Sequence, residues 1–212
     1  MNFSAAEILL IIEAAGTFAF AVSGATAAIR SRYDLFGIFV LAFVTAIGGG
    51  TIRDLLIGNL PVNWLTDSLA IFSVIAGFLF TLIVFRRMKK LEGWLFSFDA
   101  AGLGLFTVMG TQIGLEAGMG AGISIALGTI TGCFGGVLRD LLAGELPLIF
   151  QKEIYAIAAV AGGSIFVGIY QLFDALLIAQ LTGIFTIILI RFIAVKKQLG
   201  LPKFELPDES ST

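Results

Sequence analysis

Two charged pairs inside apolar sequence are the residues of this chain that could carry chemistry. An arginine and an aspartate stand side by side in AIGGGTIRDLLIGNLP as Arg53 and Asp54, and again in GCFGGVLRDLLAGELP as Arg139 and Asp140. Charged side chains within an apolar helix are costly, and they usually face the interior of a bundle or line an ion or proton path. Carboxylates beside such a path attract cations, and a guanidinium repels them. The two pairs therefore predict charged groups at the mouths of a polar path.

Two further acids lie in apolar surroundings. Glu13 opens the segment EAAG, and Asp99 opens the matching segment DAAG. Because intramembrane charges tend to pair, we expect Glu13 to associate with Arg53 and Asp99 with Arg139, one association near each mouth. In an alternative arrangement the aspartates that follow the arginines hold them directly, or line the mouths as cation-attracting groups. In another, Arg53 only extends to the lipid headgroups.

Glycine clusters precede both charged pairs. Gly48, Gly49 and Gly50 stand before the first pair, and Gly135 and Gly136 stand before the second. Glycine in a helix allows a bend, and a bend frees carbonyl groups that, with threonine hydroxyls, could face water and suit a cation. The alternative is that the glycines only allow two helices to pack closely, as small residues do throughout membrane proteins.

The composition places most of the chain in lipid. Of 212 residues, 58% are hydrophobic and 13% are charged, and the mean hydropathy is +1.01. A soluble domain has about a quarter of its residues charged. The net charge of −2 argues against a nucleic-acid partner, and one cysteine allows no disulfide framework. The chain has no histidine, so we expect no metal centre, no cofactor and no enzymatic activity.

The apolar stretches predict an all-α integral membrane protein with seven transmembrane helices, since about 20 apolar residues cross a bilayer. The first stretch contains two acids and no basic residue, which favours a retained helix over a cleaved signal peptide. The expected spans are 7–29, 35–59, 68–86, 94–115, 119–143, 154–172 and 175–195. The polar, proline-containing tail 199–212 is expected to be disordered.

The basic residues predict the orientation. In a seven-span arrangement, all of them except Arg53 fall on one side. That side holds Arg30, Arg32, Arg86, Arg87, Lys89, Lys90, Arg139, Lys152, Arg191, Lys196, Lys197 and Lys203. Because positively charged loops stay in the cytoplasm, we expect an outside N-terminus and a cytoplasmic C-terminus, most simply in a prokaryotic plasma membrane.

The chain repeats itself with an offset of 86 residues. Ten of seventeen positions are identical between Thr45–Pro61 and Thr131–Pro147, and the same offset relates the two AAG segments. Each repeat contains three spans, and an odd number inverts the second copy. Inverted repeats place a pathway at their interface. The expected units are two inverted three-helix repeats, 1–92 and 93–173, then a seventh helix over 174–198 and the tail.

These paired motifs resemble the prokaryotic branch of the trimeric intracellular cation channel family, whose repeat is also catalogued as a bacterial glycine-transporter-type domain. The resemblance implies a homotrimer in the membrane with one pore in each protomer, bounded by the second and fifth spans bent at their glycines. It implies permeation by potassium and, less selectively, sodium. It assigns pore-side hydroxyls to Thr45, Thr51 and Thr131 and the charged mouths to the two Arg–Asp pairs.

A secondary transporter for a small solute such as glycine stays open as an alternative, because inverted repeats with interrupted helices are typical of transporters. Glu13 and Asp99 could then serve proton coupling. A membrane enzyme is the weakest alternative, since the sequence has no convincing nucleophile–base motif.

Overall fold

The computed structural model describes residues 5–87, 91–150 and 154–199, and these residues form seven long helices and three short 3₁₀ turns, with no strand among them. The long helices are α1 (Ala5–Arg30), α2 (Leu35–Ile57), α3 (Ser68–Val84), α4 (Leu91–Glu116), α5 (Ala121–Leu142), α6 (Tyr155–Phe173) and α7 (Leu176–Lys196). The turns are η1 (Asn63–Leu65), η2 (Phe85–Arg87) and η3 (Leu148–Phe150). The predicted disorder of the tail concerns residues that, from 200 onward, lie outside the described part.

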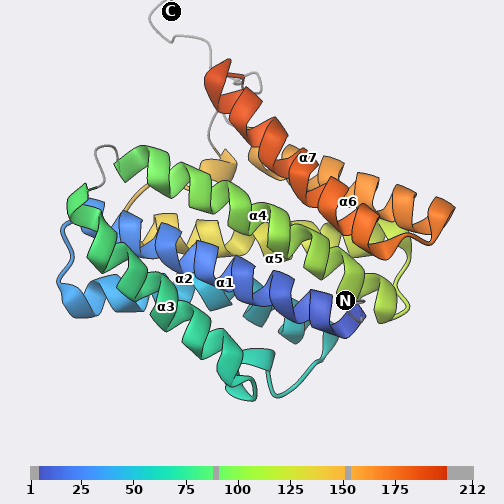
Figure 1. Cartoon of the computed structure of the whole chain (residues 1–212), viewed down its shortest axis with the longest axis horizontal. Helices are drawn as coiled ribbons and strands as arrows, with labels where there is room; N and C mark the ends of the chain where they lie inside the picture. The colour runs from blue at the N-terminus through green and yellow to red at the C-terminus, as the bar shows by residue number, and fades with distance from the viewer. Residues whose placement is uncertain (1–4, 88–90, 151–153, 200–212) are drawn as a thin grey trace, which may run out of the picture.

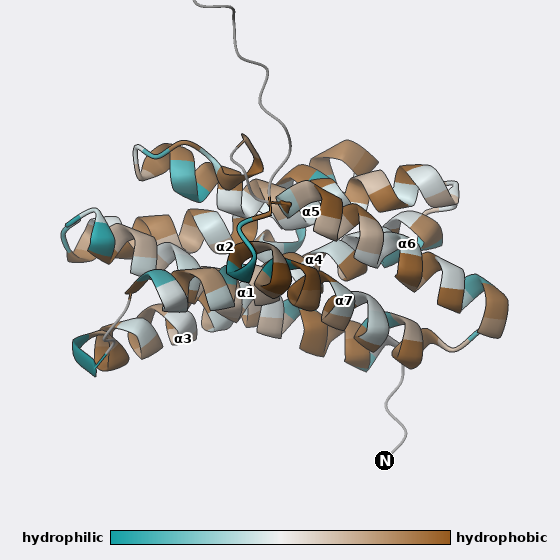
Figure 2. Ribbon diagram, turned by 90° about the horizontal axis from the view of Figure 1, so that it is seen from above, coloured by the Kyte–Doolittle hydropathy of each residue, from teal (hydrophilic) through white to brown (hydrophobic). Residues whose placement is uncertain are grey.

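The seven predicted spans are confirmed. Seven apolar segments of 19 to 26 residues are long enough to cross a membrane. Large hydrophobic side chains such as Phe72, Ile83, Leu172 and Phe185 are mostly exposed, as expected for side chains that meet lipid. Hydrophobic residues run along the helices, and hydrophilic residues gather near their ends (Figure 2).

The helices pack around a central pair, α1 and α4. Helix α1 contacts α2, α3 and α4, whereas α4 also contacts α5, α6 and α7. Helices α2 and α5 lie against each other, and α7 packs against α6 and α4 at one edge of the molecule (Figure 1). We call the face where α1 begins the N-face and the opposite face, where α7 ends, the C-face.

Equivalent residues of the two sequence repeats make equivalent contacts. A Cβ atom on Gly24 of α1 would lie 2.6 Å from the hydroxyl oxygen of Thr45. A Cβ atom on Gly110, 86 positions later in α4, would lie 2.5 Å from that of Thr131, which is also 86 positions later. Because α1 begins at the N-face and three spans precede α4, α4 begins at the C-face. These contacts support the predicted inverted repeat.

The glycine clusters do not break the helices. Helix α2 is continuous from Leu35 to Ile57, and α5 is continuous from Ala121 to Leu142. The bend that the glycines predict within these continuous helices remains a prediction. The threonine hydroxyls donate to their own helices: Thr45 to Leu41 O at 2.6 Å and Thr131 to Leu127 O at 2.7 Å.

The glycines instead allow the backbones of α2 and α5 to touch. A Cβ atom on Gly49 would overlap the carbonyl oxygen of Thr131, and one on Gly135 would lie 2.5 Å from the carbonyl oxygen of Thr45. The two contacts are related by the 86-residue offset. Close packing, the alternative reading of the sequence, is thus what Gly49 and Gly135 provide.

Candidate functional site

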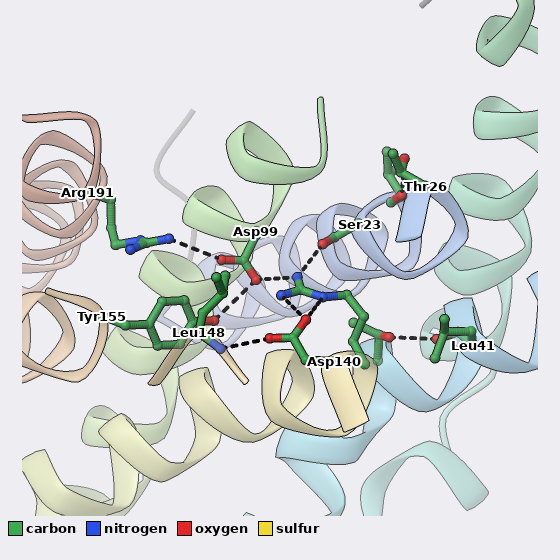
Figure 3. A network of polar contacts seen from close by, with 11 residues as sticks. Ser23, Thr26, Leu41, Asp99, Asp140, Leu148, Tyr155 and Arg191 are labelled. Carbon is green, nitrogen blue, oxygen red and sulfur yellow. Dashed lines mark hydrogen bonds and ion pairs between the residues drawn. The ribbon is translucent and has the colours of Figure 1, made fainter. Parts of the chain in front are cut away.

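Arg139 lies fully buried near the C-face and is held by three side chains. Its Nε donates to Asp140 Oδ1 at 2.8 Å, and its Nη1 donates to Asp99 Oδ1 at 2.5 Å. The same Nη1 donates to Ser23 Oγ of α1 at 2.7 Å, and the group is shown in Figure 3. The predicted association of Asp99 with Arg139 is confirmed.

Asp99 has two further neighbours from the last two helices. The hydroxyl of Tyr155 donates to Asp99 Oδ1 at 3.2 Å, and Arg191 Nη2 of α7 lies 3.8 Å from Asp99 Oδ2. We call Ser23, Asp99, Arg139, Asp140, Tyr155 and Arg191 the second-half network. It joins α1, α4, α5, α6 and α7 (Figure 3).

The aspartate of each Arg–Asp pair holds both its arginine and the following loop. Asp54 accepts from Arg53 Nε at 2.8 Å through Oδ1 and from the backbone N–H of Asn63 at 2.8 Å through Oδ2. Asp140 accepts in the same way from Arg139 Nε and, at 3.0 Å, from the backbone N–H of Leu148. The alternative in which each aspartate holds its adjacent arginine is therefore confirmed in both halves.

The first-half counterpart of Asp99 is not ion-paired in the same way. Glu13 Oε1 accepts from Asn63 Nδ2 at 2.8 Å, and no Glu13–Arg53 ion pair within 4.0 Å forms among the described residues. The predicted association of Glu13 with Arg53 does not take the form of an ion pair, because Asn63 binds the carboxylate and Asp54 binds the guanidinium. Arg53 Nη1 is buried and finds no hydrogen-bond acceptor in the described chain.

Glu13 and Arg53 nevertheless border one cavity at the N-face. We call it the N-face cavity; it has a volume of about 490 Å³. Its charged and polar lining residues are Glu13, Arg53, Asp54, Asn59, Asn63 and Asp67. A smaller hollow of about 20 Å³ shares four of them and reaches Gly50 and Thr51 of α2, a volume sufficient for about one water molecule.

This chain is similar to known membrane proteins. A family model described as "Glycine transporter" matches residues 10–86 and 96–171. A UPF0126 membrane protein of Vibrio cholerae is 40% identical over 201 residues, covering 94% of this chain and 84% of its own length. The Escherichia coli K12 inner membrane protein YadS is 37% identical over 199 residues, covering 93% and 96%.

Solved structures are also similar to this chain over most of its length. The TRIC trimeric intracellular cation channel orthologue from Rhodobacter sphaeroides superposes with a TM-score of 0.86 at 35% identity, covering 91% of this chain and 99% of that one. A prokaryotic TRIC channel superposes with a TM-score of 0.85 at 26% identity, covering 92% and 98%. This chain belongs to the prokaryotic TRIC channel family. It is an integral membrane protein, and its two matches to the family model begin 86 residues apart, at 10 and 96.

The two halves of this TRIC protein differ around their arginines. Ser23, which accepts from Arg139, corresponds by the offset of 86 to Met109, which has no side-chain oxygen. Arg53 therefore lacks the acceptor that Arg139 has, which accounts for an Nη1 that finds no acceptor among the described residues. The first-half arginine lies beside a hollow, whereas Asp99 and Arg139 have no exposed surface.

Three members of the second-half network are not predicted from the sequence: Ser23, Tyr155 and Arg191. The charge pattern places Arg191 among the basic residues of the cytoplasmic side, but it lies within α7 and is fully buried. The rule that an arginine inside an apolar helix needs an acidic partner could have found it. Ser23 and Tyr155 gave no signal, because a serine and a tyrosine are common in membrane helices.

The predicted glycine and threonine residues lie in three places: at the α2–α5 crossing, against side chains near it, and beside the small hollow. Gly49, Gly135, Thr45 and Thr131 lie at the α2–α5 crossing, where Thr45 and Thr131 are fully buried. Gly48 and Gly136 face side chains instead: Leu138 lies against Gly48, and a Cβ on Gly136 would lie 2.7 Å from the hydroxyl of Tyr155. Gly50 and Thr51 border the hollow.

Proposed function

We propose that this protein is a passive channel for monovalent cations, with potassium preferred over sodium and one path in each protomer beside the α2–α5 crossing. The observation that carries the proposal is the hollow below the N-face cavity. It continues a charged vestibule into the membrane-spanning part of α2 and borders Ile47, Gly50 and Thr51. The solved structures that the chain resembles are described as cation channels.

The second-half network supplies the gate in this proposal. A guanidinium with no exposed surface closes the C-face half, and three side chains hold it in place. A cation that follows the path from the N-face meets this positive charge, so conduction requires that Arg139 moves aside. The glycines at positions 48–50 and 135–136 give α2 and α5 the freedom to bend during that movement.

We further propose a homotrimer of such protomers in a prokaryotic plasma membrane, with the N-face outside and lipids around the exposed apolar side chains. A relative in the comparison is named as a trimeric channel. Of the described basic residues in helix ends and turns, Arg30, Arg32, Arg86, Arg87, Lys196 and Lys197 lie toward the C-face. In this account 1–92 and 93–173 are the inverted repeats, 174–198 adds the seventh helix, and we propose no catalytic role and no cofactor.

Planar bilayer recording tests the channel proposal. Purified full-length protein is incorporated into a bilayer with a potassium chloride gradient, and the solutions are then changed to potassium on one side and sodium on the other. We expect discrete unitary currents that reverse near the potassium potential in the gradient and show a preference for potassium in the mixed solutions. Smooth currents that saturate, or no currents with monodisperse protein, would oppose a channel.

Neutralising Glu13 is expected to lower the unitary conductance in dilute salt. The Glu13 carboxylate lines both the N-face cavity and the hollow, so it concentrates cations at the entrance. We expect Glu13→Gln to reduce conductance by about 30–50% at 10 mM potassium chloride and by much less at 1 M, because the screening length falls from about 30 Å to about 3 Å.

Asp174→Asn is the matched control for this variant. Asp174 is an exposed acid on the same face, at the C-cap of α6 with φ 49°, a backbone conformation that asparagine also adopts. It borders neither the N-face cavity nor the hollow. Equal conductance losses in the two variants would show that Glu13 acts only through the general surface charge.

A secondary transporter of a small zwitterion such as glycine is the second candidate function. The observation that favours it is that Arg53 and Glu13 border the same hollow, where Arg53 Nη1 is a buried donor without an acceptor in the described chain. These groups could bind a carboxylate and an ammonium. Saturable uptake of labelled glycine into proteoliposomes, driven by a proton or sodium gradient, would favour this function over the channel.

A further inference from the structure

We propose that Arg191 of α7 is a positioning residue of the gate: it is the counter-charge that stays with Asp99 when Arg139 moves aside. The inference rests on the proposed channel function and adds to it a role for the seventh helix. That helix has no counterpart in the three-helix repeat, so Arg191 has no equivalent around Glu13.

The geometry of Asp99 shows two separate sides. Its Oδ1 is occupied by Arg139 Nη1 at 2.5 Å and by the Tyr155 hydroxyl at 3.2 Å. Its Oδ2 accepts no hydrogen bond from the described residues and faces Arg191 Nη2 at 3.8 Å. The two arginines therefore approach different oxygens of one carboxylate, and one can leave while the other remains.

Arg191 is held in that direction by aromatic rings. Its Cζ lies 4.6 Å from the centre of the Tyr155 ring and 5.3 Å from that of Phe96. Rings at these distances attract a guanidinium. Since Phe96 belongs to α4 and Tyr155 to α6, the arginine of α7 lies between α6 and α4, the helix that carries Asp99.

The energetic consequence concerns the open state. Asp99 has no exposed surface, and an acid left without a counter-charge in a protein interior is strongly unfavourable. In the closed state both arginines neutralise it. Once Arg139 withdraws, Arg191 is the one counter-charge that remains near Asp99 among the described residues, so its charge stabilises the open state more than the closed state. The contrast with Glu13 fits this account, because Glu13 is only partly buried and lies beside the N-face cavity.

Removal of the Arg191 charge should therefore make the channel open less often. We expect Arg191→Gln to lower the open probability in planar bilayers by about tenfold or more. In this variant each opening leaves the buried Asp99 carboxylate without a counter-charge, which is unfavourable. Arg191→Lys keeps the charge and should restore most of the loss. Lys196→Gln removes a positive charge from the exposed end of the same helix and should leave the open probability unchanged.

A double variant separates this role from a purely structural one. With Asp99→Asn there is no acid to strand, so adding Arg191→Gln should change the open probability less than about twofold relative to Asp99→Asn alone. The same comparison decides the question if Arg191→Gln alone does not give folded protein. A tenfold effect in the Asp99→Asn background, or an unchanged open probability in Arg191→Gln, overturns the inference. Absence of wild-type currents overturns the proposed function and this inference together.

Discussion

Arg139→Ala raises the time-averaged cation current of the channel by at least about fivefold in our account. The substitution removes the guanidinium that closes the C-face half and leaves Asp99 facing the path with Arg191 as its remaining counter-charge. The cation then meets a carboxylate in place of a positive charge, and charges of this kind govern entry into narrow paths. Single-channel recording in symmetric potassium chloride measures the change.

Arg139→Lys is the matched variant, because it keeps the positive charge while losing the paired donors that hold Asp140 and Ser23. We expect its current to lie between those of the wild type and Arg139→Ala. Unchanged currents in folded Arg139→Ala protein would show that Arg139 is only an anchor of α5 and would remove the gate from the proposed mechanism.

Gly49→Ala is expected to destabilise the protein, although Gly50→Ala at the next position is not. A Cβ at position 49 overlaps the carbonyl oxygen of Thr131, a backbone atom of α5 that cannot move without separating the helices. Overpacking of this kind costs about 1–3 kcal/mol. A Cβ at position 50 meets only Arg53 Nη2, at 3.9 Å, and alanine favours a helix by about 1 kcal/mol over glycine.

Thermal unfolding of the two variants in detergent, followed with their size-exclusion profiles, measures this contrast. Gly135→Ala should repeat the result of Gly49→Ala, because its Cβ would lie 2.5 Å from the carbonyl oxygen of Thr45. Similar unfolding midpoints for the variants at positions 49 and 50 would mean that α2 and α5 are not pressed together at this crossing.

The fold could be predicted from the sequence because its main signals are long and repeated. Apolar stretches of about 20 residues form membrane-spanning helices. The 86-residue offset relates the two halves over three helices. The glycine clusters are compatible with two structures. A glycine permits both a broken helix and a close crossing, and only the position of the Thr131 carbonyl opposite Gly49 decides between them.

The site could be predicted in part, and the errors have a common physical source. A similar depth in the membrane predicts that Glu13 associates with Arg53, and the repeat extends the prediction to Asp99 and Arg139. Asp99 and Arg139 form the ion pair. Glu13 and Arg53 do not, because Asn63 and Met109 replace the surroundings found in the second half. An internal repeat predicts that the two halves share a backbone fold. Which charged side chains form ion pairs depends on single residues that differ between the halves.

This difference between the halves matters for the mechanism. The first half has a hollow beside Arg53, and the second half has a buried network around Arg139. The central claim is therefore that water and cations reach α2 from the N-face, and that the path is closed beyond the α2–α5 crossing.

Cysteine modification during recording tests that claim most directly. Thr51 borders the hollow, whereas the native Cys133 is buried. A membrane-impermeant cationic thiosulfonate, added to the N-face side of a bilayer that contains Thr51→Cys protein, should reduce the unitary current in irreversible steps and leave the wild-type current unchanged. A potassium current that persists at full amplitude after position 51 has been modified, as verified by mass spectrometry, would place the path elsewhere and contradict the account.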